Sequence, residues 1–241
     1  MGKVLILSIL AGLSCATSGC HSNATPDHPP ATATIAAAAD PAPPTGNLQP
    51  ATDNRPPDSR PLLVCFGDSL TAGLGTGPGE SYPDYLQADL DRLHYHYRVD
   101  NQGISGNTTK DGVERLPEIL ALHPAVVLVE FGGNDGLRGL RIEDTRANLD
   151  TIVSTLKNSS AKIALAGISL PPDYGPDYIR QFNETYTLLA KKYNVPMLPF
   201  LLKDVYGVPG MMQRDQTHAT ARGNQIVARN VIPLILPLLK K

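Results

Sequence analysis

The sequence predicts an α/β protein, a three-layer sandwich in which a flavodoxin-like sheet of five parallel strands carries helices on both faces. Five short apolar runs alternate along residues 62–241 with segments whose apolar residues recur at helical spacing. Strands and helices in this order form parallel sheets with right-handed crossovers. Residues 21–61, by contrast, contain ten prolines in 41 positions. That segment buries too little apolar surface to offset its ordering entropy, so the fold is confined to residues 62–241.

The strands are predicted from apolar runs that end at turn residues, or from alternating apolar and polar residues. They are expected at residues 62–66, 95–99, 126–131, 162–168 and 195–200. The run 126–131 is the strongest of these signals, and two glycines at 132 and 133 end it.

The helices are predicted from apolar residues that recur on one helical face. They are expected at residues 82–93, 111–122, 142–156, 178–193 and 222–239. Glu143 and Asp144 stand where a helix N-terminus favours acidic side chains. Pro233 is expected to kink the last helix.

The first twenty residues have the pattern of an export signal. Lys3 precedes an apolar run over residues 4–13, which is too short for a bilayer that needs about 20 residues. The end of the segment, Thr17-Ser18-Gly19-Cys20, resembles the lipobox of bacterial lipoproteins, whose cysteine is diacylated. This implies membrane anchoring through lipidated Cys20, with residues 21–61 as a Pro/Ala-rich linker. Ordinary secretion after cleavage nearby is the alternative.

The composition excludes several classes of protein. Lys and Arg number 21 against 23 Asp and Glu, a net charge of −2, so nucleic acid is not an expected partner. Three cysteines exclude a disulfide-stapled miniprotein, and Cys65 alone lies in the predicted domain. His94 and His96 have no further ligands nearby in the sequence. We expect no cofactor and no metal ion, and we expect the protein to be a monomer.

Four loops contain the candidate functional residues. Ser69 follows the first strand, Gly106 lies in the loop after the second, and Asn134 follows the third. Asp215 and His218 stand just before the last helix. Ligands of such sheets bind beyond the carboxyl ends of the strands, so these residues are expected to meet there.

These residue types fit nucleophilic catalysis. His218 is a candidate general base for Ser69, and Asp215 could hold its other ring nitrogen and stabilise the imidazolium. Gly106 could offer a backbone N–H and Asn134 a side-chain N–H. Each loop alone is equally compatible with turn or capping chemistry, so the prediction depends on the conjunction of all four. The chain order Ser, Asp, His is workable in a sheet of this kind.

The loops together resemble the SGNH (GDSL) hydrolase family. The matching blocks are Phe66-Gly-Asp-Ser-Leu70, Asn101-Gln-Gly-Ile-Ser-Gly106, Gly132-Gly-Asn-Asp135 and Asp215-Gln-Thr-His218. The resemblance is greatest to the bacterial multifunctional thioesterase/lysophospholipase and arylesterase branch. In one departure, Ala219 follows His218 where the family usually has proline.

The resemblance implies a serine esterase that hydrolyses carboxylic esters or thioesters, such as aryl esters, short-to-medium acyl esters or lysophospholipids, through an acyl-enzyme. Ser69, Asp215 and His218 would be catalytic, and Ser69, Gly106 and Asn134 would form the oxyanion hole. The loops 137–140 and 169–175 would shape an acyl pocket. A carbohydrate acetylesterase of the same fold, or a non-catalytic ligand-binding surface lipoprotein, is the alternative. The expected location is the bacterial periplasm or cell envelope.

Overall fold

The computed structural model describes residues 58–241. The predicted signal peptide, Cys20 and the linker up to residue 57 lie outside this range. Five parallel strands form one sheet, in the order β2-β1-β3-β4-β5. Their bounds are β1 Leu62–Gly67, β2 Arg98–Gly103, β3 Val126–Glu130, β4 Lys162–Ala166 and β5 Met197–Leu198. This is the predicted flavodoxin-like order, and its switch point lies between β1 and β3.

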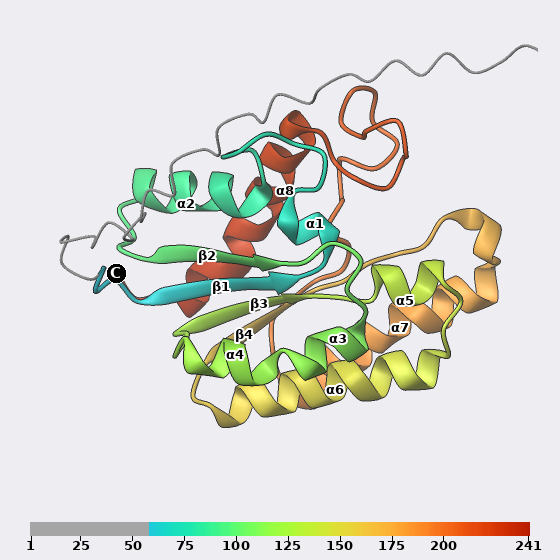
Figure 1. The fold of residues 1–241 in the computed structure, drawn as a ribbon, viewed down its shortest axis with the longest axis horizontal. Coiled ribbons are helices and arrows are strands. Elements are labelled where there is room, and N and C mark those ends of the chain that lie inside the picture. The colour runs from blue at the N-terminus through green and yellow to red at the C-terminus, as the bar shows by residue number, and fades with distance from the viewer. Residues whose placement is uncertain (1–57) are drawn as a thin grey trace, which may run out of the picture. The chain divides into compact units, whose positions relative to one another are not determined.

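Helices cover both faces of the sheet, which confirms the three-layer prediction. In Figure 1, α2 and α8 lie on one face, and α3, α4, α6 and α7 lie on the other. The helices are α1 Ser69–Ala72, α2 Tyr82–Arg92, α3 Thr109–Glu114, α4 Leu116–Ala121, α5 Gly133–Leu137, α6 Ile142–Asn158, α7 Pro176–Tyr193 and α8 Ala221–Ile235. Short 3₁₀ turns span Pro172–Tyr174 and Leu236–Leu238. Within residues 58–241, no helix is long and apolar enough to cross a membrane.

Several elements differ from their predicted bounds, and the fifth strand, predicted at residues 195–200, is reduced to Met197–Leu198. The second strand begins at Arg98 rather than at residue 95, because it is an edge strand whose half-exposed polar side chains hide its alternation. The predicted helix 111–122 is two helices that meet at Arg115, with Pro117 in the first turn of α4. The last helix ends at Ile235, two residues after Pro233, and a 3₁₀ turn follows.

The core lies on both faces of the central strands. Every residue of β1 and β3 is buried, including the thiol of Cys65. At the ends of these strands, Phe66 and Phe131 pack edge to face, with ring centroids 4.8 Å apart. Tyr186 of α7 donates a hydrogen bond to the Phe131 carbonyl over 2.8 Å. These contacts hold the carboxyl ends of β1 and β3 rigidly below the loops that follow them.

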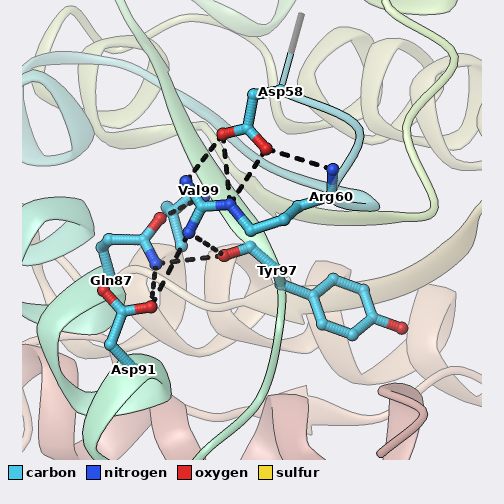
Figure 2. A network of polar contacts seen from close by, with 6 residues as sticks. All are labelled: Asp58, Arg60, Gln87, Asp91, Tyr97 and Val99. Atoms are coloured by element: carbon cyan, nitrogen blue, oxygen red, sulfur yellow. Dashed lines mark hydrogen bonds and ion pairs between the residues drawn. The ribbon is translucent and has the colours of Figure 1, made fainter. Parts of the chain in front are cut away.

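A polar network attaches the edge strand to α2 (Figure 2). Gln87 of α2 accepts a hydrogen bond from Val99 N at 2.7 Å and donates one to the Tyr97 carbonyl at 3.0 Å. Arg60, which precedes β1, reaches the same carbonyl at 3.3 Å and contacts Asp58 at 2.7 Å. Hydrogen bonds from the side chains of Gln87 and Arg60 therefore hold the start of β2, which is paired with another strand on one side only.

Candidate active site

Ser69 begins the short helix α1 directly after β1. Asp68 caps this helix, because its Oδ1 accepts a hydrogen bond from Leu70 N at 3.0 Å. Gly73 ends the helix in the left-handed conformation, with φ of 74°. The local sequence Gly67-Asp68-Ser69 therefore places the hydroxyl at the carboxyl edge of the sheet, beside the switch point.

Asp215, His218 and Ser69 form a continuous hydrogen-bonded line. His218 Nε2 lies 2.8 Å from Ser69 Oγ, and His218 Nδ1 lies 2.7 Å from Asp215 Oδ2. Because an ionised carboxylate only accepts hydrogen bonds, Nδ1 carries the ring proton, and Nε2 is left as the acceptor for the serine hydroxyl. The structure therefore brings together the three residues predicted to act on an ester.

The Asp215 carboxylate is fixed by the turn that it begins. Burial raises its pKa, but hydrogen bonds from the His218 side chain and backbone and from Thr217 N outweigh burial and lower the pKa to about 2. The two backbone donors lie 3.0 Å and 2.9 Å from Oδ1. Asp215 is consequently an anion throughout the neutral range.

The turn that holds His218 is closed without the proline usual in the resembling family. Ala219 forms an antiparallel bridge with Met212, and its carbonyl accepts a hydrogen bond from Gln213 Nε2 at 2.8 Å. Gln213 N also donates to the His218 carbonyl at 2.8 Å. Hydrogen bonds on both sides of the ring therefore fix the backbone of the turn.

The three residues expected to supply oxyanion donors, Ser69, Gly106 and Asn134, come from three different loops. The backbone N–H groups of Ser69 and Gly106 donate to no other protein group within the described residues 58–241. Gly106 has φ of +84°, a conformation that favours glycine, although a Cβ there would meet only open space and the tip of Arg138. Asn134 Nδ2 donates to the Asn107 carbonyl at 2.9 Å and to Asp68 Oδ2 at 3.1 Å, so both of its hydrogens have protein acceptors, and one of them must be released to reach an oxyanion. All three residues border one pocket.

This pocket has a volume of about 630 Å³, within the range of small-molecule sites. Ser69 and His218 lie in its wall. Its other lining is largely apolar and includes Leu74, Leu137, Ile168, Leu170, Met197 and Phe200. Leu137 and Leu170 come from the two loops expected to shape an acyl pocket. Met211 and Met212, which precede the turn of His218, are buried in the core.

Sequence reasoning missed two buried carboxyl groups behind the serine. Asp68 is 2% exposed and Glu130, the last residue of β3, is fully buried. Burial raises the pKa of Asp68 to about 6, and burial together with the nearby Asp68 charge raises the pKa of Glu130 well above its usual range. The available signal was a glutamate at the end of an otherwise apolar buried strand.

The described residues contain no cluster of three His, Cys, Asp or Glu side chains that could hold a metal ion. The fold and the Ser69–His218–Asp215 line define the class of protein as an α/β serine hydrolase. Residues 65–226 match the GDSL-like Lipase/Acylhydrolase family. The chain belongs to this family and is a carboxylic ester hydrolase.

Similarity to known members of the family covers about three quarters of this chain. The chain is 41% identical to Esterase TesA of Pseudomonas aeruginosa over 178 residues, which are 73% of this chain and 89% of that protein. It is 38% identical to Thioesterase 1/protease 1/lysophospholipase L1 of Escherichia coli (strain K12) over 73% of this chain and 84% of that protein. A crystal structure of TesA superposes with a TM-score of 0.72 at 41% identity, over 74% of this chain and 99% of that one.

Proposed function

We propose that Ser69 is the nucleophile of an acyl-enzyme esterase, with His218 as its general base and Asp215 as the group that orients His218. The observation that carries this proposal is the hydrogen-bonded line of 2.8 Å and 2.7 Å from Ser69 Oγ to Asp215. A serine hydroxyl becomes an effective nucleophile only when a neutral imidazole accepts its proton. Asp215 fixes the tautomer that leaves Nε2 able to accept it.

The reaction proceeds in two halves. Ser69 Oγ bonds to the ester carbonyl carbon while its proton moves to His218 Nε2, and the carbonyl oxygen becomes an oxyanion. In the proposed cycle, the N–H groups of Ser69 and Gly106 and the Asn134 amide stabilise that charge. His218 then gives its proton to the leaving alcohol or thiol, which leaves an acyl-serine. Water attacks the acyl-serine by the same route and frees the acid.

The pocket wall favours esters with an apolar acyl group larger than acetyl. Its lining includes leucine, isoleucine, methionine and phenylalanine side chains, and no lysine or arginine. Each buried methylene is worth about 0.8 kcal/mol, or about fourfold in kcat/KM, until the pocket is filled. Aryl esters, short-to-medium acyl esters and lysophospholipids fit this wall, and thioesters fit the same chemistry.

A chain-length series of p-nitrophenyl esters tests the substrate class. We expect kcat/KM to rise from acetyl to at least butyryl, and lysophospholipid to be hydrolysed. A maximum at acetyl with no turnover of longer chains would instead indicate a carbohydrate acetylesterase of the same fold. An acyl-CoA run beside an oxygen ester of the same chain length measures the thioester preference.

The substitution Ser69→Ala tests the nucleophile. We expect the loss of ester hydrolysis by about 10⁴- to 10⁶-fold with an unchanged circular dichroism spectrum. Ser154→Ala on α6 is the matched control, because Ser154 Oγ only donates to the Thr151 carbonyl of its own helix. Hydrolysis at near the wild-type rate by Ser69→Ala would overturn the assignment.

We also propose that the chain is exported and anchored to a membrane through lipidated Cys20, which lies outside the described residues. The leader pattern and the lipobox-like Thr17–Cys20 sequence support this proposal. The expected result is a membrane-bound protein that becomes soluble when Cys20→Ala is made. A wild-type protein without an N-terminal lipid in its mass spectrum would contradict the anchoring and favour ordinary secretion.

A further inference from the structure

Two carboxyl side chains are buried next to each other below Ser69. Glu130 ends β3, and its backbone is paired in register with Gly67 of β1, the residue before Asp68. The Glu130 side chain fills the space beside Gly67, where a Cβ would come within 2.5 Å of Glu130 Oε2. Strand pairing therefore delivers Glu130 to the residues that hold the serine.

The surroundings of Glu130 favour the protonated acid. Its Oε2 accepts hydrogen bonds from Thr71 Oγ1 at 2.7 Å and from Asp68 N at 3.3 Å. Its Oε1 is buried and accepts no hydrogen bond within residues 58–241. No ion pair in the described part of the chain includes either Glu130 or Asp68. A buried carboxyl group without a cation retains its proton, and Oε1 is then a hydroxyl donor.

Asp68 is the neighbouring acceptor for that donor, since its backbone N–H already binds Glu130 Oε2 over 3.3 Å. A hydrogen bond from the neutral Glu130 acid to the Asp68 carboxylate would lower the pKa of Asp68 and raise the pKa of Glu130. The other contacts of Asp68 extend into the candidate active site. Its Oδ1 accepts from Leu70 N and caps the helix of Ser69, and its Oδ2 accepts from the Asn134 amide. The charge of His218 also lowers the pKa of Asp68.

We propose that Glu130 is a positioning residue for ester hydrolysis. Held as the neutral acid, it donates a hydrogen bond to ionised Asp68, which in turn orients the Asn134 amide and the first turn of α1. The anion of Asp68 also stabilises the imidazolium that forms on His218. Glu130 keeps its proton throughout the reaction cycle. The proposal rests on the proposed function of Ser69, His218 and Asn134.

The other titratable groups around the pair come from four elements. Cys65 of β1, Tyr82 of α2 and Tyr186 of α7 face Glu130, and burial raises the pKa of each. Asp135 of α5 acts on Tyr186 from behind. The Cys65 thiol and both tyrosines therefore stay neutral in the acid and neutral range. Among the carboxyl groups of the pair, Asp68 remains as the one whose charge changes there.

Two substitutions separate donation from simple space filling. Glu130→Gln keeps a neutral donor of the same shape, whereas Glu130→Met keeps the approximate volume without a donor. A hydrogen bond to a charged group is worth about one to two pH units of its pKa, or about 10- to 100-fold in an equilibrium. We expect kcat of the Met variant at pH 7.5 to fall by about 10- to 100-fold, with KM changed less than about threefold. The acid limb of its kcat profile should move up by about one to two pH units.

The Gln variant should restore both readouts, with kcat within about fivefold of the wild type and an unmoved acid limb. Glu118→Gln on the exposed surface of α4 is the matched control. A Gln variant as impaired as the Met variant would overturn the proposal, and so would a Met variant with wild-type kcat and acid limb. If the Met variant fails to fold, the Gln variant alone tests the proposal. Loss of activity in the Gln variant would contradict the role of residue 130 as a neutral donor, and full activity would support it.

Labelling of each variant with a fluorophosphonate separates the two proposals. If wild-type Ser69 is labelled but the Glu130→Gln and Glu130→Met variants have the same kcat and the same acid limb as each other, only the role proposed for Glu130 fails. If the active wild type is not labelled at Ser69, the proposed function fails.

Discussion

The protonation of Glu130 predicts how the stability of the domain depends on pH. The test is Glu130→Gln, which removes the titrating group and keeps its shape. In the unfolded chain a glutamate ionises with a pKa near 4.3. In the folded chain, burial without a cation and the adjacent Asp68 charge raise the pKa of Glu130 well above its usual range. Above about pH 5, the folded wild type therefore holds one proton that the unfolded chain releases.

The sign and size of the effect follow from proton linkage. Because the folded state binds more protons, the free energy of unfolding falls as pH rises, by about 1.36 kcal/mol per pH unit for one proton. The Gln variant lacks this proton in both states. Asp68, whose raised pKa also destabilises the fold as pH rises through about 6, is present in both proteins. Its contribution therefore largely cancels when the two proteins are compared.

Urea unfolding at pH 5.5, 6.5 and 7.5 gives the free energy of unfolding of each protein. The wild type should lose stability relative to the Gln variant between the first and last pH, by at most about 2.7 kcal/mol, which is two pH units at 1.36 kcal/mol each. The difference in the free energy of unfolding at one pH alone does not test the prediction, because the substitution itself can change the stability equally at every pH. Parallel pH dependences would refute the reasoning, because they would mean that Glu130 is already ionised in the folded protein.

Three further predictions concern the site and its frame. Asn134→Ala should lower kcat on a p-nitrophenyl ester by about 10²- to 10³-fold through the loss of one oxyanion donor, and a loss below tenfold would make Asn134 a structural residue. Asp215→Asn should lower kcat by about 10³- to 10⁴-fold by favouring the wrong tautomer of His218, and near-normal turnover would argue against that role. Gly132→Ala should cost at least about 3 kcal/mol in urea unfolding, because φ is 117° and the Cβ would lie 2.4 Å from Tyr186 Oη. Gly207→Ala, at φ of 74° with open space around it, should cost only about 1–2 kcal/mol, and equal costs would refute the clash.

The central sheet could be predicted because its strands are buried on both faces. The runs Leu62–Gly67 and Val126–Glu130 are apolar throughout apart from their last residues, as expected for strands inside a parallel sheet. The edge strand Arg98–Gly103 is paired on one side only, and its sequence carries no such signal. Because Tyr95 and Tyr97 alternate with polar residues, the start of this strand was predicted at residue 95, three residues before its actual start at Arg98.

The contacts within the site could not be predicted from the periodicity of apolar residues, because they depend on very short helices and on strand register. The helices of Ser69 and Asn134 have four and five residues, too few for an amphipathic pattern. The residues of the line from Ser69 to Asp215 could be named from their loops, because parallel strands bring their carboxyl ends to one edge. The pairing of Asp68 with Glu130 could not, because it depends on the register that places Gly67 beside Glu130.

Covalent labelling tests most directly the proposal that Ser69 is a nucleophile activated by His218. The purified protein is treated with a fluorophosphonate, and its intact mass and peptide map are measured together with residual esterase activity. We predict one adduct per chain, on Ser69, formed in step with the loss of activity and absent from Ser69→Ala. An esterase that loses its activity with the adduct on another residue, or that stays active with Ser69 fully labelled, would contradict the claim.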